Sequence, residues 1–295
     1  MSLRKRSMLV TLNMHQWTGQ KLDHKVSHEV CDAYGTNSNA GNFKKNLVPK
    51  HHLKAIAQQV SKTRSWFYNN TLPWQHGGFG MLSGKNFLKF TKEYNNHKDR
   101  FWVLVEQFLT EYDKLKDNAA IELQGLFNER DYPPVEVIRK KFAFEHIIIP
   151  MPDTYDPRLN IPEEELATLA AANEVLTKQA DEAAHKEVYT RLYTALAKFV
   201  LILRQPDQVF KNTTVLNLLE ISKKVPDLIL KDDHELVSAA NNTFKIMDDL
   251  DIKRVRKYDD YRQLRADFLK PLDFDWTCWY SGKNTAILSR RERGG

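Results

Sequence analysis

Apolar residues recur at helical spacing through most of this chain. After Pro49 they return every three or four positions, at Leu53, Ile56, Val60 and Phe67, and this spacing predicts a helix. A wider apolar stripe runs from about residue 86 to residue 118 and predicts a second, well-buried helix. The pattern therefore indicates a protein that is mostly α-helical.

Two short stretches have the features of β-strands. Residues 8–15 alternate loosely between apolar and polar side chains and predict an edge strand, followed by a short helix over about 21–34. Residues 142–149 are β-branched near their end and stop at Pro150, which also predicts a strand. Residues 35–41 are a clear loop, because Gly and Asn tolerate positive φ.

Residues 163–204 predict a long helical arm. Three glutamates follow Pro162, where the helix dipole favours carboxylates. The apolar positions hold a heptad-like, coiled-coil spacing, shift phase near His185 and then resume, which we interpret as an antiparallel helical hairpin rather than an uninterrupted coiled coil. These positions are Leu166, Leu169, Leu176, Ala180 and Ala183, then Leu192, Leu196, Phe199 and Leu203.

The remaining pattern predicts three regions. A proline-rich connection between residues 150 and 162 separates a basic, aromatic-rich α+β region (1–158) from the helical arm and its packing helices (159–270). The packing helices are expected over 207–223 and 233–269, each opened by an Asp cap, and residues 271–295 are expected to form a small hairpin with a basic tail. The predicted fold class is mostly α with minor β (α+β).

The net positive charge of the chain is concentrated near its N-terminus. The 295 residues carry 44 Lys+Arg and 38 Asp+Glu, yet residues 1–75 hold 11 basic and 3 acidic residues, so the other 220 sum to −2. Clustered Lys and Arg favour an anionic partner, nucleic acid first, because binding releases phosphate counterions. A solubilising basic surface explains the same asymmetry, and the sequence leaves both explanations open.

Several functional classes are disfavoured. The two cysteines, Cys31 and Cys278, are too few for a disulfide framework and favour a reducing cytosol. The longest strongly apolar run, Phe199 to Leu203, is far shorter than the roughly 20 residues of a membrane helix, so we expect a soluble protein without membrane contact. The basic N-terminus lacks the features of a signal peptide.

No motif identifies catalysis or a cofactor. Gly84 and Lys85 are followed by Asn86 rather than the Ser or Thr of a phosphate loop, and no Gly-x-Ser-x-Gly elbow is present. His24, His28 and Cys31 share one helical face, but no fourth ligand is identifiable. We therefore predict no catalytic residues, no metal and no cofactor, although an enzyme whose groups converge from distant positions remains a third alternative.

The most distinctive chemistry is an aromatic cluster beside basic residues. Bases stack on exposed rings while Lys and Arg follow the phosphates in proteins that bind single strands. The alternative is that the rings are core, in which case Tyr68 and Trp74 are the two expected to be partly exposed. The cluster comprises Trp66, Phe67, Tyr68, Trp74 and Phe79, and the candidate nucleic-acid-binding residues are Lys44, Lys45, Lys54, Lys62, Arg64, Tyr68 and Trp74.

A second basic stripe lies near the C-terminus. Arg254, Lys257, Tyr261 and Arg265 fall within about 80° on a helical wheel, so on one helix they would share a face suited to a nucleic-acid backbone and a stacked base. The acidic neighbours, such as Asp259 and Asp260, fit a plain salt-bridged surface equally well. Both interpretations stay open.

Several segments, which together span most of the chain, resemble a known family of tailed-phage and prophage proteins catalogued as domain of unknown function 3150. These segments are residues 66–74 (WFYNNTLPW) with the glycine-rich turn after them, 87–94, 126–133 (LFNERDYP), 142–144 and 215–220 (VLNLLE). The resemblance implies a phage or mobile-element origin and a cytoplasmic location in a phage-infected or prophage-carrying host. It brings no catalytic residues.

Two hypotheses follow. The first is a non-enzymatic phage protein of DNA replication or recombination that binds nucleic acid, single-stranded DNA first. The second is a helical adaptor or scaffold whose arm, residues 163–204, docks a phage ring ATPase or inhibits a host factor. The sequence leaves the oligomeric state open.

Overall fold

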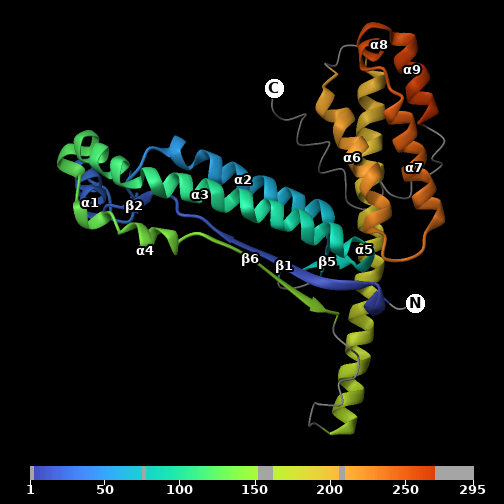
Figure 1. The fold of residues 1–295 in the computed structure, drawn as a ribbon, viewed down its shortest axis with the longest axis horizontal. Coiled ribbons are helices and arrows are strands. Elements are labelled where there is room, and N and C mark those ends of the chain that lie inside the picture. Colours follow the sequence, from blue (N-terminus) through green and yellow to red (C-terminus); the bar gives the residue numbers. More distant parts are fainter. Residues whose placement is uncertain (1–2, 75–77, 152–161, 206–209, 270–295) are drawn as a thin grey trace. The chain divides into compact units, whose positions relative to one another are not determined.

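The computed structural model describes residues 3–74, 78–151, 162–205 and 210–269 (Figure 1). Helices dominate and the strands form small sheets, which confirms the predicted class. The chain divides into two compact units, residues 1–185 and 186–295. The sequence predicted a boundary at 158/159, whereas the first unit extends to His185, inside one long helix.

A four-stranded antiparallel sheet forms the base of the first unit, in the order β4-β5-β1-β6. β1 (Ser7–His15) pairs with β5 (Gly80–Ser83) and with β6 (Ala143–Pro150), and β4 (Leu72–Pro73) extends the sheet beyond β5. The predicted strand near residues 142–149 is confirmed as β6. β1 is not the edge strand that the sequence predicted, because β5, for which no strand was expected, pairs with its other side.

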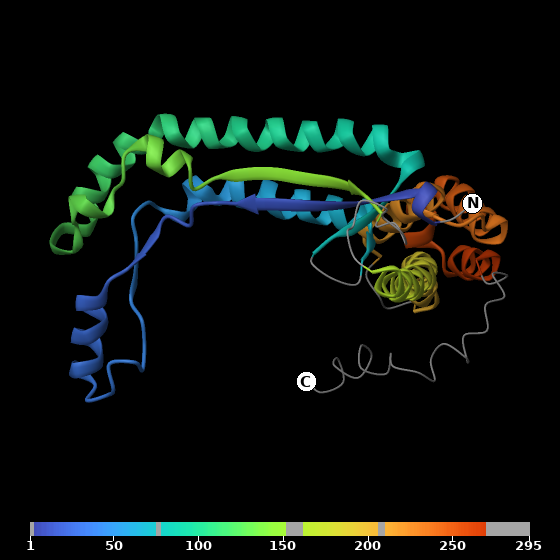
Figure 2. The same cartoon turned by 90° about the horizontal axis from the view of Figure 1, so that it is seen from below.

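Two long helices cover one face of this sheet. α2 (Lys50–Asn70) packs against α3 (Phe87–Leu123), and both predicted helices are thereby confirmed. Alternate residues of the strands, such as Val10, Met14 and Phe144, join the helices in one apolar core. Figure 2 shows α3 running along the strands. α2 is thus held rigidly on its inner face, which leaves its outer face to carry polar residues.

Short elements complete the first unit. β2 (Gln20–Leu22) pairs with β3 (Lys44–Asn46) in a separate two-stranded sheet, and Asp23 caps α1 (His24–Ala33) by accepting a hydrogen bond from the Val26 amide at 3.2 Å. The predicted loop over 35–41 is confirmed, with Gly35 at φ 62°. The others are α4 (Val135–Arg139) and the 3-10 turns η1 (Leu3–Lys5), η2 (Gly84–Asn86), η3 (Gln124–Leu126) and η4 (Glu129–Asp131).

The predicted helical arm is one continuous helix, α5 (Glu163–Arg204), and not an antiparallel hairpin. No Gly or Pro interrupts it, so nothing in the backbone opposes helix continuation. The phase shift near His185 coincides with the boundary between the units. Before it the helix buries Ala180 and Ala184, and after it Leu192 and Leu196. The shift therefore marks a change of the buried face rather than a turn.

The second unit is helical and contains the end of α5 with α6 (Asn212–Leu228), α7 (His234–Asp248), α8 (Ile252–Lys257) and α9 (Asp259–Phe268). The predicted Asp233 cap of α7 is confirmed, since its carboxylate accepts from the Leu236 amide at 2.8 Å. The single helix expected over 233–269 is instead three helices. Asp251 caps α8 through the Lys253 and Arg254 amides, and Tyr258 is extended (φ −127°), so each starts a new helix.

Two predictions lie outside the described residues, namely the Asp207 cap and the C-terminal hairpin over 271–295. No helix in the described part of the chain is long and apolar enough to cross a membrane.

Candidate nucleic-acid interface

The outer face of α2 carries basic side chains and no acidic ones. Its buried positions, including Ile56, Val60 and Phe67, follow the apolar spacing and face the core. At about 100° per residue, Lys50, Lys54 and Tyr68 lie within about 40° of one another on the opposite side. The exposed cations of the helix are Lys50, Lys54, Lys62 and Arg64, and we call this surface the α2 face.

The cations of the α2 face lack carboxylate partners. Among the described residues, Lys50, Lys54 and Lys62 form no ion pair, and Arg64 donates a long hydrogen bond of 3.5 Å to the Met14 carbonyl. Acidic residues near the helix belong to α3, where Glu111 approaches His52 at 3.5 Å near the start of α2. The positive charge of the α2 face is therefore available to an anionic ligand.

The aromatic cluster divides into core and surface residues. Trp66 is half-buried and stacks on Phe90, with ring centroids 4.7 Å apart and planes at 28°, and Phe67 is buried. Tyr68 is 64% exposed and Trp74 is half-buried, so both rings are partly exposed as expected, and Phe79 is half-buried as well. Phe67 is therefore the one ring of the cluster that is fully in the core, and Tyr68 presents an exposed ring at the end of the α2 face.

Lys45 does not belong to a phosphate-binding surface. Its ammonium is buried and donates to three acceptors, Asp131 at 2.6 Å, Asp23 at 3.1 Å and the Leu126 carbonyl at 2.9 Å. A lysine has three N–H donors, so this set uses all of them. We therefore remove Lys45 from the candidates, whereas its neighbour Lys44 is exposed on β3.

The carboxylate of Asp131 is the centre of this buried cluster. Burial by itself raises its pKa, but hydrogen bonds and charges from Lys21 and Lys45 outweigh burial and hold the pKa below its usual range. Burial likewise lowers the pKa of Lys45, yet Asp131 and Asp23 raise it overall. Both groups stay charged at neutral pH and fasten β2 and β3 to η4, so their role is structural.

The second basic stripe is rearranged relative to its prediction. Tyr261 is only 7% exposed, so its ring cannot stack on a base as predicted. The guanidinium carbon of Arg254 lies 4.5 Å from its ring centroid, and that of Arg265 lies at 5.2 Å. Lys257 lies 5.2 Å from the ring of Tyr258, which is 45% exposed and was not predicted as a site residue. The sequence feature that could have identified Tyr258 is its position directly after Lys257, at the start of a new helix.

The histidines and cysteine of α1 do not converge on one point. Cys31 is buried, whereas His24 and His28 are exposed on the same short helix. Within the described ranges, no group of three or more His, Cys, Asp or Glu residues is arranged to hold a metal ion.

A polar cluster containing His97 joins α2 to α3 beneath the α2 face. The Gln59 amide nitrogen lies 3.1 Å from Nδ1 of His97, Thr63 Oγ1 lies 3.1 Å from the same nitrogen, and Trp66 packs on the imidazole. Burial lowers the pKa of His97, and the charges of Lys62 and Arg100 lower it further. The ring is therefore neutral at pH 7, with its proton assigned to Nε2 because the Gln59 amide donates to Nδ1.

We expect the first unit to lose stability as the pH falls below about 6.5, the usual pKa of histidine. The folded-state pKa of His97 lies below the unfolded value, so the stabilisation is complete above the unfolded pKa and is lost as the pH falls through the folded one. Urea unfolding at pH 7.5 and 5.5, followed by circular dichroism, measures this loss. The His97→Gln variant should lose less unfolding free energy between these two pH values than the wild type. The control His51→Gln, on the exposed side of α2, should lose as much as the wild type. Equal losses in all three proteins would contradict a stabilising role of neutral His97.

Comparisons with protein-family models, with curated proteins and with solved structures found no match to this chain. The resemblance to the tailed-phage family therefore stays a prediction.

Proposed function

We propose that the protein is a non-enzymatic nucleic-acid-binding protein and that the α2 face carries the contact. One observation supports this most directly: α2 has no acidic residue, and Lys50, Lys54 and Lys62 have no carboxylate partner among the described residues. A nucleic-acid backbone supplies the missing negative charge and gains affinity by releasing its counterions. The buried inner face of α2 holds the helix in place, so these cations stay on its exposed side, spread over about 120° of the helix surface.

We further propose that the preferred ligand is single-stranded DNA. Tyr68 lies on the same arc of α2 as Lys50 and Lys54 and is 64% exposed, so a base can stack on its ring while the lysines contact phosphates. In a duplex the base faces are covered by stacking on their neighbours, which removes that contribution. The half-buried Trp74, four residues after the end of α2, is the second candidate ring for stacking.

The resemblance noted above supports a setting for this activity. It suggests a protein of phage DNA replication or recombination that acts in the cytoplasm of a phage-infected or prophage-carrying bacterium.

A second candidate function is a helical adaptor, and α5 supplies the observation in its favour. Leu169 is 47% exposed, Val175 54% and Leu176 37%, so the first half of this helix presents apolar side chains to solvent. Leu169 and Leu176 are seven residues apart and so lie on the same side of the helix, two turns from each other, which is a spacing used by helices that dock in the groove of a partner. A ring ATPase or a host factor is the partner proposed in this case.

Charge reversal on the α2 face tests the first proposal. Lys54→Glu should weaken binding of a fluorescein-labelled oligo-dT by about tenfold at low salt, because one phosphate contact is lost and a repulsion replaces it. Fluorescence anisotropy measures the dissociation constant. Lys114→Glu is the matched control, since it makes the same change at an exposed position of α3 among Glu111, Asp113 and Asp117, and it should change binding little.

The two functions predict different outcomes of this titration. Equal affinities for Lys54→Glu and Lys114→Glu would show that net charge alone drives binding and would contradict the α2 face as the site. No binding of any strand at low salt would contradict nucleic-acid binding and favour the adaptor.

A further inference from the structure

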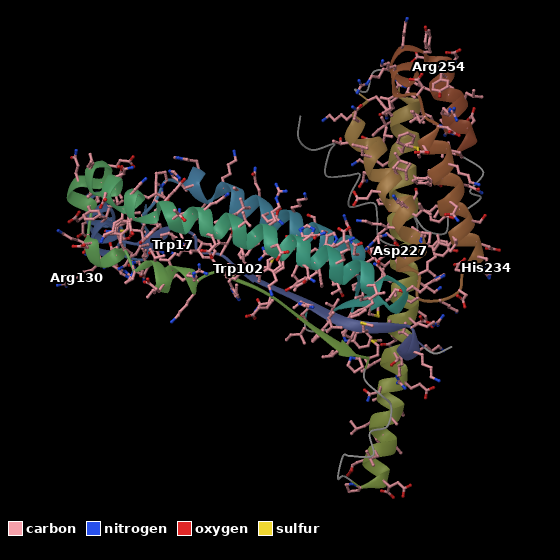
Figure 3. The ribbon with its side chains drawn as sticks, in the orientation of Figure 1. Trp17, Trp102, Arg130, Asp227, His234 and Arg254 are labelled. Atoms are coloured by element: carbon pink, nitrogen blue, oxygen red, sulfur yellow. The ribbon has the colours of Figure 1, made fainter. Side chains whose placement is uncertain are left out.

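One end of the second unit carries an unusual concentration of cations. α8 has the sequence Ile-Lys-Arg-Val-Arg-Lys, with four basic and no acidic residues, and Val255, which is fully buried, anchors it in the core of the unit. Figure 3 labels Arg254 at the α8 end of the helices. Arg265 of α9 joins this set because it contacts the same ring as Arg254.

The two guanidinium groups are positioned by a fixed tyrosine. Tyr261 is buried, and its hydroxyl lies 3.4 Å from the Asp251 amide and 3.1 Å from Nε of Arg265. The guanidinium carbon of Arg254 lies 4.5 Å from the ring centroid. A cation held against a ring keeps most of its N–H donors free, unlike one held by a carboxylate.

Neither guanidinium has a carboxylate partner within the part of the chain that the structure describes. Elsewhere in the same unit such partners are common: Arg191 pairs with Glu187 at 2.8 Å and Lys224 with Glu220 at 2.6 Å. The nearby acids are engaged differently, because Asp251 caps α8 and Asp259 lies 3.7 Å from Arg262. Arg254 and Arg265 are therefore ready to bind an external anion.

An exposed ring lies beside these cations. Tyr258, between α8 and α9, is 45% exposed, and the ammonium of Lys257 lies 5.2 Å from its ring centroid. A ring with a cation near it and solvent access is a suitable platform for a nucleic-acid base. Two guanidinium groups without a carboxylate partner in the described part of the chain and one exposed ring thus occur within a few residues of each other.

We infer that the second unit contains its own single-strand contact, in which Arg254 and Arg265 bind phosphate and Tyr258 stacks on a base. This inference rests on the proposed function and extends it, because the α2 face belongs to the other compact unit. Residues 248–267 hold six basic and six acidic residues, so the local net charge is zero. Recognition here depends on the planar, paired donors of the arginines rather than on bulk charge.

Photochemical crosslinking separates this site from the α2 face. The full chain is irradiated with an oligonucleotide containing 5-iododeoxyuridine, digested with trypsin and analysed by fragment mass spectrometry. Cleavage after Lys257 and Arg262 releases residues 258–262, and cleavage after Arg64 and Lys85 releases residues 65–85, so crosslinks to Tyr258 and to Tyr68 are read independently. We expect a crosslink at Tyr258.

Arginine variants provide the second arm of this test. The double change Arg254→Lys and Arg265→Lys keeps both charges but loses the guanidinium forks, and it should abolish the Tyr258 crosslink and weaken strand binding by about fivefold. Lys245→Gln, an exposed site on α7, should change neither.

Each outcome has one meaning. A crosslink at Tyr68 without one at Tyr258 would overturn the second site and leave the α2 face standing. A crosslink at Tyr258 that survives the double Arg→Lys change with unaltered yield would overturn the requirement for the guanidinium forks of these arginines. The absence of crosslinks at both Tyr68 and Tyr258 in the wild type would contradict the proposed function itself.

Discussion

Asp131→Ala is expected to destabilise the first unit by about 3 kcal/mol, because it leaves the buried ammonium of Lys45 without its nearest carboxylate. Asp23 and the Leu126 carbonyl still accept from that ammonium, so the loss stays at the lower end of the range for broken buried ion pairs. Urea unfolding gives the change in free energy, and hydrogen–deuterium exchange of peptides covering β3 and η4 should locate it.

Lys21→Met is the matched control for this change. Lys21 contacts the same carboxylate at 2.5 Å, but its side chain is 50% exposed, so its loss should cost less than about 1 kcal/mol. Equal destabilisation by the two variants would contradict the idea that burial of Lys45 sets the energy.

Arg262→Ala is expected to destabilise the second unit by about 2–3 kcal/mol, since it removes two hydrogen bonds that close the end of α5. The Arg262 side chain is buried and donates to the Ile202 carbonyl at 2.9 Å and the Gln205 carbonyl at 2.7 Å. The last carbonyls of a helix have no partner inside the helix, and a cation at this end also interacts favourably with the helix dipole.

Thermal unfolding and exchange of the α5 peptides measure this effect. Arg204→Ala, at the same end of α5, is the control, because its side chain is 42% exposed and lies 3.8 Å from Asp267, a distance at the limit for an ion pair. It should cost less than about 1 kcal/mol. A comparable loss in both variants would show that helix-end charge, and not the buried hydrogen bonds, stabilises the unit.

The long helices of the first unit were predictable because their apolar spacing is regular and extends over many turns. Leu53, Ile56 and Val60 fixed the inner face of α2, and this also placed Lys54 on its outer face. The stripe from Leu192 to Leu203 likewise predicted the buried side of the second half of α5.

Features that depend on long-range contacts were not predictable. β5 is four residues long in a glycine-rich stretch, and only its pairing with β1 makes it a strand. Lys45 looked like one more cation beside Lys44, because its partner Asp131 is far away in the sequence. The phase shift near His185 was visible, but a continuous helix that changes its buried face produces the same pattern as a turn.

The predicted arrangement of the second basic stripe was wrong for a local reason. It required one helix from residue 233 to 269, but Asp251 and Tyr258 each begin a new helix. The new geometry brings Arg254 and Arg265 to Tyr261 and exposes Tyr258 in its place.

The salt dependence of single-strand binding tests the central claim most directly. Dissociation constants for labelled oligo-dT are measured by anisotropy across a salt series, for the wild type and for Lys54→Glu. If the four cations of the α2 face each neutralise one phosphate, they contribute about −3 to the slope of log affinity against log salt, at about −0.7 for each phosphate of a single strand, and Lys54→Glu should remove about 0.7 of that contribution. A slope near zero, or the same slope in both proteins, would contradict the account.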